Sequence, residues 1–187
     1  MENQDYLQKI KMVIERCILG DRKAQYQVYE MYSKAMFNIC VRITNNLEEA
    51  EDVLQEAFVS AFRNIKSFKG EGSFGAWLKK IVVNHAINHL RKKKLQFVDI
   101  DNLAEGAMNK TIEEEKIDER EITLEVGKIR RAIRLLPDGY RVVFSLYLLE
   151  GYDHKEISEI LNISESTSKS QFNRAKKKLK EIMLENG

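Results

Sequence analysis

The sequence predicts an all-α protein made of two small helical domains, and three observations support this fold class. The chain has 187 residues with one proline and nine glycines, so few residues interrupt helices. Its apolar residues recur at spacings of three and four rather than in strict alternation. The density of apolar residues drops after Val98 and recovers near Leu124. We therefore expect one domain over residues 1–95, a flexible acidic linker over 96–123 and a second domain over 124–187.

The first domain is expected to contain helices joined by short turns. Gly20 separates the first two helices, and Asp21 has a side chain that can cap the second. Asn46, followed by Glu49 three residues later, has the spacing of a capping box at the start of the third. The helices are expected over about 6–19, 21–43, 46–65 and 74–93, with a loop over 66–73 before the last.

The second domain is expected to end in a helix-turn-helix. Two helices, over about 124–136 and 138–150, precede this motif. Asp153 and Glu156 have capping-box spacing, and Asn162 suits the sharp turn because Asn tolerates left-handed backbone geometry. Ser164 can cap the next helix, which begins with small polar residues and continues with a basic cluster. Such a helix can reach base edges in the major groove of duplex DNA while its basic residues meet phosphates.

Charge is segregated along the chain although the net charge is only +2. Residues 78–97 and 169–180 are rich in Lys and Arg and contain no acid, and the acidic stretch 113–121 lies between them. This pattern favours two separate contacts with nucleic acid over general binding to polyanions. The alternative for each basic patch is an ordinary solvated helix face.

Few residues in the chain indicate chemistry. Cys17 and Cys40 lie in helical patterns and are interpreted as small buried hydrophobes rather than a disulfide. His85 and His89 have a spacing that can bind a metal, but no third ligand completes a site. His85, with Asn84 and Asn88, is interpreted instead as polar surface of the basic helix. We therefore expect no enzyme, no catalytic residue, no metal and no cofactor. The charged start of the chain and the lack of an apolar run of ~20 residues predict a cytoplasmic protein without direct membrane insertion.

The loop before the fourth helix combines aromatic residues, glycines and positive charge. Phe68, Phe74 and Trp77 bracket a glycine-containing loop, and the basic helix follows it. Aromatic rings beside positive charge suit single-stranded nucleic acid, because bases stack on the rings while the backbone meets Lys and Arg. The alternative is that Phe74 and Trp77 belong to the core.

The third helix has a polar face that could dock a basic partner helix. Three of its side chains project together because they are spaced three and four residues apart. They are Asp52, Gln55 and Glu56. The alternative is a solvated face without a partner.

Taken together, these motifs resemble the extracytoplasmic-function (ECF) subfamily of bacterial sigma-70 factors, and the likeness covers nearly the whole chain. The segment 50–65, AEDVLQEAFVSAFRNI, is similar to region 2.2, which binds the clamp helices of the RNA polymerase β′ subunit. The segment 67–88, SFKGEGSFGAWLKKIVVNHAIN, is similar to regions 2.3 and 2.4, which melt and read the −10 element. The segment 136–179 is similar to region 4, which reads the −35 element. The resemblance implies a factor that binds core polymerase and directs promoter-specific transcription initiation.

The resemblance also implies site residues and partners. The polymerase-docking positions are Asp52, Gln55 and Glu56. The positions that contact the −10 element are Phe68, Lys69, Gly70, Ser73, Phe74, Lys79, Lys80, Asn84 and Asn88. The positions that contact the −35 element are Ser166, Thr167, Lys169, Ser170, Gln171, Arg174 and Lys178. Expected partners are core polymerase, through its β′ clamp helices and β flap, promoter DNA and an anti-sigma factor.

The chain departs from the family pattern at three positions. Asn162 stands where the family usually has Gly, and Ser168 where it usually has Val. Ser168 falls on the inward face of its helix, which predicts looser packing there. Gln171 stands where Arg is frequent, and Gln pairs with adenine whereas Arg prefers guanine, so we expect an unusual −35 sequence. The runner-up interpretation is a stand-alone helix-turn-helix regulator, which would leave the acidic helix and the aromatic loop without a purpose.

Overall fold

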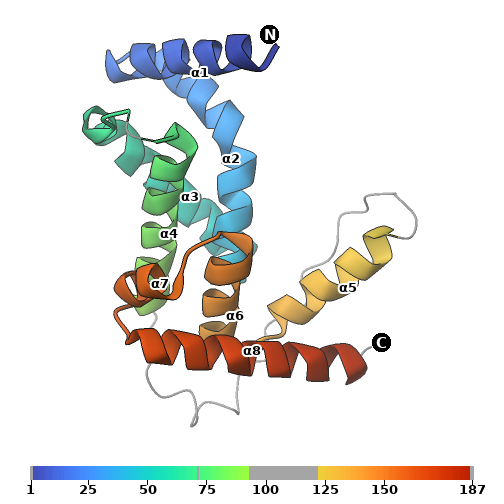
Figure 1. Ribbon diagram of the computed structural model, residues 1–187. Coiled ribbons are helices and arrows are strands. Elements are labelled where there is room, and N and C mark those ends of the chain that lie inside the picture. Colours follow the sequence, from blue (N-terminus) through green and yellow to red (C-terminus); the bar gives the residue numbers. More distant parts are fainter. Residues whose placement is uncertain (1, 71, 93–121, 186–187) are drawn as a thin grey trace. The chain divides into compact units, whose positions relative to one another are not determined.

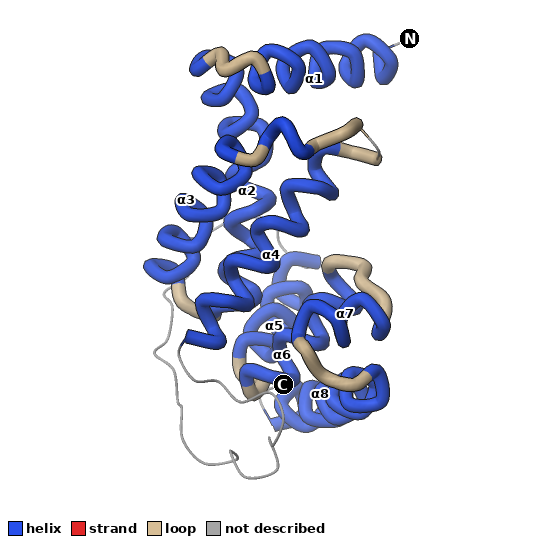
Figure 2. Tube along the Cα trace, turned by 90° about the vertical axis from the view of Figure 1, so that its left-hand side faces the viewer, coloured by secondary structure: helices blue, strands red, loops and turns tan. Residues whose placement is uncertain are grey.

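The computed structural model of the chain describes residues 2–70, 72–92 and 122–185. The chain separates into two compact units, Met1–Lys92 and Lys93–Gly187. Figures 1 and 2 show helices joined by loops in both units, with no strand in the described ranges. The predicted all-α class with two helical domains is therefore confirmed.

Some sequence expectations fall outside the described residues. These are the linker as far as residue 121, its acidic run over 113–121, and Lys93 and Lys94 of the first basic patch. Within the described ranges, no helix is long and apolar enough to cross a membrane.

Unit 1 is built around three helices that pack against one another, with a further helix packed on the second of them (Figure 1). The elements are α1 (Glu2–Ile18), α2 (Arg22–Thr44), α3 (Leu47–Arg63), the 3₁₀ turn η1 (Ile65–Ser67) and α4 (Phe74–Lys92). The core lies where α2, α3 and α4 meet, because each contributes apolar side chains at helical spacing. Ile43, Val53, Leu78, Val82 and Ile87 are each at most 1% exposed.

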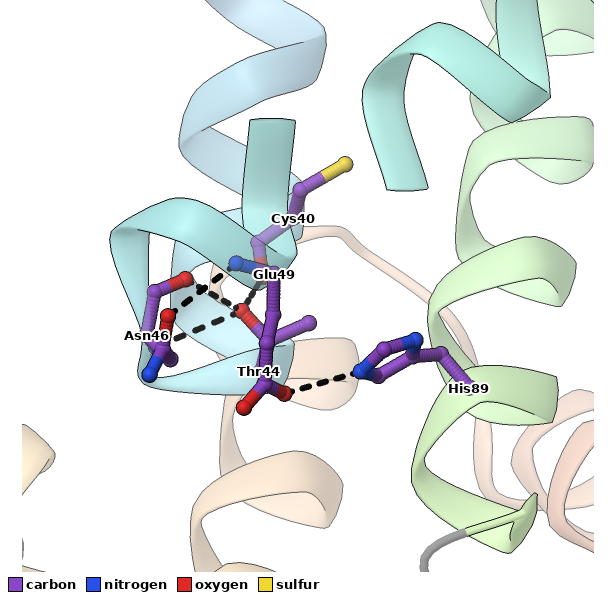
Figure 3. A network of polar contacts seen from close by, with 5 residues as sticks. All are labelled: Cys40, Thr44, Asn46, Glu49 and His89. Atoms are coloured by element: carbon purple, nitrogen blue, oxygen red, sulfur yellow. Dashed lines mark hydrogen bonds and ion pairs between the residues drawn. The ribbon is translucent and has the colours of Figure 1, made fainter. Parts of the chain in front are cut away.

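Side-chain caps fix the helix boundaries in unit 1, as the sequence predicts. Asp21 accepts hydrogen bonds from two backbone N–H groups in the first turn of α2. Asn46 Oδ1 accepts from the backbone N–H of Glu49, at 3.0 Å, and thereby begins α3. The Thr44 hydroxyl lies 3.0 Å from the carbonyl oxygens of both Cys40 and Asn46 (Figure 3). These contacts hold the turn from α2 into α3 in one conformation.

Both cysteines lie buried in unit 1 as free thiols, which confirms their predicted role as small hydrophobes. Burial raises the pKa of the Cys17 thiol to about 11, with a further contribution from Asp21. Burial also raises the pKa of the Cys40 thiol to about 12. Because the thiolate is the nucleophile, both groups are chemically inert near neutral pH.

Unit 2 is a second helical cluster in which the long last helix packs against the helices before it (Figure 1). Its elements are α5 (Ile122–Arg134), α6 (Asp138–Phe144), the π-helical segment η3 (Ser145–Leu149), α7 (His154–Leu161) and α8 (Glu165–Glu185). Arg141 is only 2% exposed, pairs with Asp138 and donates to the carbonyl of Leu136 at 3.2 Å. The bond to Leu136 ties α6 to the turn that follows α5, and the pairing with Asp138 compensates in part for the burial that lowers the pKa of Arg141.

The predicted helix over 138–150 is regular only as far as Phe144. Beyond it, the chain forms the wider π-type turn, in which the N–H of Glu150 donates to the carbonyl of Ser145 at 3.0 Å. The extra residue in this turn rotates the side chains that follow, so Leu148 and Leu149 are 53% and 47% exposed. A strict 3.6-residue period would place Leu149 on the apolar face with Val142 and Leu146, and the π turn is the reason that Leu149 is exposed instead.

Candidate nucleic-acid interfaces

The helix-turn-helix of unit 2 is set by caps that the sequence predicts. Asp153 and Glu156 form the reciprocal capping box, with bonds of 2.8 and 2.9 Å, at the start of α7. Asn162 takes the left-handed conformation, with a φ of 57°. Ser164 Oγ accepts from the N–H of Thr167 at 3.0 Å and so caps α8. The turn therefore fixes the direction in which α8 leaves α7.

The outward face of α8 carries most of the residues that the sequence assigns to duplex DNA. Ser166, Lys169, Ser170 and Arg174 are exposed, while Thr167 and Lys178 are partly exposed. Lys169 pairs with Glu165 at 2.6 Å, and Lys178 pairs with Glu181 at 3.3 Å. The hydrogen bond from Lys169 also lowers the pKa of the Glu165 carboxyl. Both lysines are therefore already paired with an acid of their own helix.

Gln171 does not belong to this outward face. Its side chain is only 5% exposed and lies on the inner side of α8, together with Ser168, Phe172 and Ala175. A side chain buried in this way cannot reach a base edge, so the expectation that Gln171 contacts the −35 element is wrong. The helical period already indicates this position, because Gln171 follows the inward Ser168 by three residues.

Ser168 is accommodated by a specific contact rather than by looser packing. It is fully buried, and its Oγ lies 2.9 Å from Nδ1 of His154. The His154 ring stacks on Tyr147, with 4.4 Å between the centroids and 15° between the planes. Tyr147 also packs against Phe172 at 4.5 Å. This cluster joins η3, the start of α7 and the inner face of α8, so the predicted looseness is not observed.

The aromatic residues around the loop of unit 1 form one cluster. The Phe68 ring lies 5.3 Å from Phe74 and 5.7 Å from Trp77, and Phe74 also lies 5.5 Å from Tyr32. Phe74 is 4% exposed, so its ring cannot stack on a base, and its expected −10 contact is wrong. Phe68 and Trp77 remain partly exposed at the rim. Phe74 thus packs beneath the rings of Phe68 and Trp77 and supports both.

The loop itself presents polar and flexible residues beside this cluster. Lys69, Gly70 and Ser73 are exposed, and Ser73 Oγ accepts from the N–H of Ala76 at 3.2 Å to cap α4. Gly70 and Gly72 have φ angles of 77° and 83°, in the left-handed region that side chains rarely adopt. The loop can therefore fold sharply next to Phe68.

The basic helix α4 turns one polar stripe outward. Lys80, Asn84 and Asn88 are exposed at four-residue intervals, while Lys79 is partly exposed. Arg91, which the sequence prediction omitted from the site, donates to Asn88 Oδ1 at 3.4 Å. Arg91 follows Asn88 by three residues, so the helical period was the signal that could have found it.

The two histidines of α4 face α3 rather than the outward stripe. His89 Nε2 lies 2.9 Å from a carboxylate oxygen of Glu49 (Figure 3), and His85 Nδ1 lies 3.8 Å from Glu56. Their side chains are 28% and 30% exposed. The interpretation of His85 as polar surface of the basic helix is therefore corrected, because both histidines contact α3. Within the described residues, no cluster of three metal-ligating side chains occurs.

The acidic face of α3 is open to solvent as expected. Asp52, Gln55 and Glu56 are exposed, and so are Glu48 and Glu51 nearby. The opposite side of α3 is core. The helix therefore offers a row of negative and polar groups that a basic helix of another protein can approach.

Comparisons with known proteins agree with this layout. A model described as Sigma-70 region 2 matches residues 28–96, and one described as Sigma-70, region 4 matches residues 127–179. The ECF RNA polymerase sigma factor SigW of Bacillus subtilis (strain 168) is 33% identical over 91% of this chain and 95% of that protein. The ECF RNA polymerase sigma-E factor of Haemophilus influenzae is 31% identical over 93% of this chain and 92% of that protein.

Two solved structures show the same fold at lower sequence identity. One is the sigma factor RpoE of Bartonella quintana, solved in complex with the anti-sigma factor NepR, with a TM-score of 0.58 at 20% identity. It covers 84% of this chain and 95% of its own. The other is CnrH in complex with the cytosolic domain of CnrY, with a TM-score of 0.55 at 19% identity and coverage of 94% and 97%. With motifs, fold and relatives in agreement, the chain belongs to the ECF RNA polymerase sigma factors of the sigma-70 family and directs promoter-specific transcription initiation.

Proposed function

We propose that this sigma factor docks on core polymerase through α3 and places its two units on two promoter elements. Residues 1–95 supply the docking face and the −10 contacts, residues 124–187 supply the −35 contacts, and 96–123 connects them. This division of labour needs binding and positioning only and no covalent chemistry, and it takes place in the cytoplasm, where core polymerase acts.

Docking uses the exposed row of Asp52, Gln55 and Glu56 against the clamp helices of β′. The carboxylates steer a basic partner helix into place, and Gln55 adds hydrogen-bonding capacity between them. Glu56 also lies 3.8 Å from His85 of α4. The docking row of α3 therefore contacts α4, the helix proposed to bind the −10 element.

The −10 element is held by the loop and the outward stripe of α4. An unpaired base stacks at the rim formed by Phe68 and Trp77, which Phe74 supports from below. Extruding a base costs a few kcal/mol, which stacking and hydrogen bonds in the loop must offset. Contacts from the loop and stripe are assigned to Lys69, Gly70, Ser73, Lys79, Lys80, Asn84 and Asn88.

The −35 element is bound as duplex by α8. The start of α8 enters the major groove with Ser166, Thr167 and Ser170, while Arg174 is suited to guanine. Lys169 and Lys178 neutralise phosphates. Gln171 has no part in this contact because it is buried.

Two further partners complete the proposal. Unit 2 contacts the β flap of polymerase, and the exposed Leu148 and Leu149 of η3 supply an apolar surface for it. An anti-sigma factor is the proposed inhibitor, by analogy with the complexes in which similar folds have been solved.

The observation that carries the proposal is the separation of three polar faces on three helices of one chain. The acidic face of α3 and the basic, amide-rich faces of α4 and α8 all lie in solvent while their opposite sides form the cores. An ordinary helix-turn-helix regulator requires only the last of these faces.

Run-off transcription with purified core polymerase tests the docking face. The variant Asp52→Arg with Glu56→Arg is expected to lose core binding and transcription, because like charges then oppose the basic partner. The control, Glu15→Arg with Glu30→Arg, makes the same charge change on exposed acids of α1 and α2, outside the docking helix. Equal loss in both variants, or core binding by the first at wild-type affinity, would refute the assigned docking residues.

A further inference from the structure

Asn173 lies on the DNA-facing side of α8 but has no role in the contacts assigned so far. It is exposed, and it follows Lys169 by four residues and Ser170 by three. On a helical wheel at ~100° per residue, the outward arc of α8 runs from Lys169 to Arg174. Asn173 lies within this arc, between Lys169 and Ser166. Asn173 is therefore surrounded by side chains that the −35 contact already uses.

Because Gln171 is buried, its side-chain amide is not available to read a base. Asn173 carries the same amide group. Either amide can accept from adenine N6 and donate to adenine N7, a pairing that distinguishes adenine from the other bases. The Gln171 side chain is 5% exposed and lies ~160° around the helix from Asn173. Of these two amides, only that of Asn173 faces the groove.

The position of Asn173 along α8 also suits a base edge. It follows Ser166 by seven residues, which is ~10 Å at ~1.5 Å per residue. Base pairs are ~3.4 Å apart along the DNA axis, to which a helix in the major groove is inclined, so Asn173 faces a pair at most about three steps from the pair beside Ser166. Lys169 lies one turn before Asn173, and the basic cluster that contains Lys178 begins only after it.

We propose that Asn173 is a specificity-determining residue that selects an adenine in the −35 element. This inference rests on the proposed placement of α8 in the major groove. The adenine lies at most about three base pairs from the position whose preference depends on Ser166, on either strand of the duplex.

The experiment is transcription by core polymerase loaded with the full chain, on double-stranded promoter fragments randomised at both elements. Each fragment carries a transcribed barcode that identifies its promoter sequence, and sequencing the barcodes in transcripts made with the wild-type chain defines the preferred bases. Asn173→Ala is expected to lower the preference for adenine at one −35 position by about 5- to 150-fold and to leave the −10 profile unchanged. Asn173→Asp is expected to move that preference toward cytosine, because a carboxylate accepts from cytosine N4.

The possible outcomes separate this inference from the proposed function. An unchanged profile in both variants, or a uniform loss over all sequences, makes Asn173 a bystander or a phosphate contact and overturns the inference. If the wild-type chain with core polymerase enriches no sequence at all, the proposed function itself fails. Far-UV circular dichroism excludes unfolding of the variants, and the switch to cytosine in Asn173→Asp cannot result from instability.

Discussion

The helices α4 and α8 both present a polar stripe to solvent, but they are held in place in different ways. The buried residues of α4 are all apolar, and Leu78, Val82 and Val83 are each 0% exposed. The inner face of α8 includes Ser168 and Gln171, which are polar and buried. An apolar face is held by non-directional burial, whereas a polar inner face depends on particular hydrogen bonds.

This difference has a consequence for how each helix responds to substitution. Loss of apolar volume under α4 lowers the stability of unit 1 and leaves the direction of α4 largely intact. Loss of a hydrogen bond beneath α8 leaves a buried polar group without its partner. The position of α8, the helix proposed to read duplex DNA, is therefore expected to change. The only tryptophan and both cysteines lie in unit 1. Tryptophan fluorescence and thiol labelling therefore report on unit 1 separately from unit 2.

The largest expected effect is on α4. Leu78→Ala removes a fully buried side chain and is expected to lower the unfolding free energy of unit 1 by about 2–5 kcal/mol. Urea unfolding followed by Trp77 fluorescence measures this change. Faster labelling of Cys17 and Cys40 by a thiol reagent should accompany it, since both are buried in the same unit. Lys80→Ala, on the exposed side of α4, is the control and should change stability by no more than ~0.5 kcal/mol.

A loss below ~1 kcal/mol in Leu78→Ala would contradict the view that apolar burial holds α4 in place. The paired contacts of His89 with Glu49 and of His85 with Glu56 would then be the main link between α3 and α4.

An intermediate effect is expected beneath α8. Ser168→Val removes the hydroxyl that lies 2.9 Å from His154 Nδ1 and should destabilise unit 2 by about 1–3 kcal/mol. Adding His154→Leu removes the polar group that has lost its partner, so the double variant should recover part of the stability, with a coupling of about 0.5–3 kcal/mol. Hydrogen exchange of α7 and α8 measures both changes, and the Trp77 transition should not move.

Ser170→Val is the matched control for this prediction, because it makes the same substitution on the exposed side of the same helix. If Ser168→Val and Ser170→Val prove equally stable, the hydrogen bond to His154 contributes nothing. Strictly additive effects of Ser168→Val and His154→Leu would lead to the same conclusion.

The parts of the fold that depend on local sequence could be predicted. The capping box of Asp153 and Glu156, the left-handed Asn162 and the Ser164 cap each involve residues within a few positions of one another. The inward position of Ser168 also follows from the helical period alone. The same period places Gln171 inward, and its 5% exposure agrees with the period rather than with the base contact that the family resemblance implies.

The parts that depend on tertiary contacts could not be predicted. His89 and Glu49 are 40 residues apart in sequence, and no local pattern indicates that they meet. The π-type turn of η3 shifts the register of Tyr147, which lets its ring stack on His154. Phe74 could be assigned either to a base contact or to the core, and only its packing against Tyr32, Phe68 and Trp77 decides for the core.

The smallest expected effect concerns the buried amide of α8. Gln171→Leu keeps a side chain of similar size on the inner face, so α8 should stay seated and its outward face should remain intact. Its −35 profile on the randomised promoter fragments should therefore match the wild-type profile to within about twofold at every base, well below the effect of losing a base-edge contact. A marked loss of adenine preference in Gln171→Leu, with none in Asn173→Ala, would place Gln171 in the groove after rearrangement of the inner face. That result would show that the polar inner face of α8 can turn outward on DNA, a freedom that the apolar inner face of α4 lacks because its exposure to water is unfavourable.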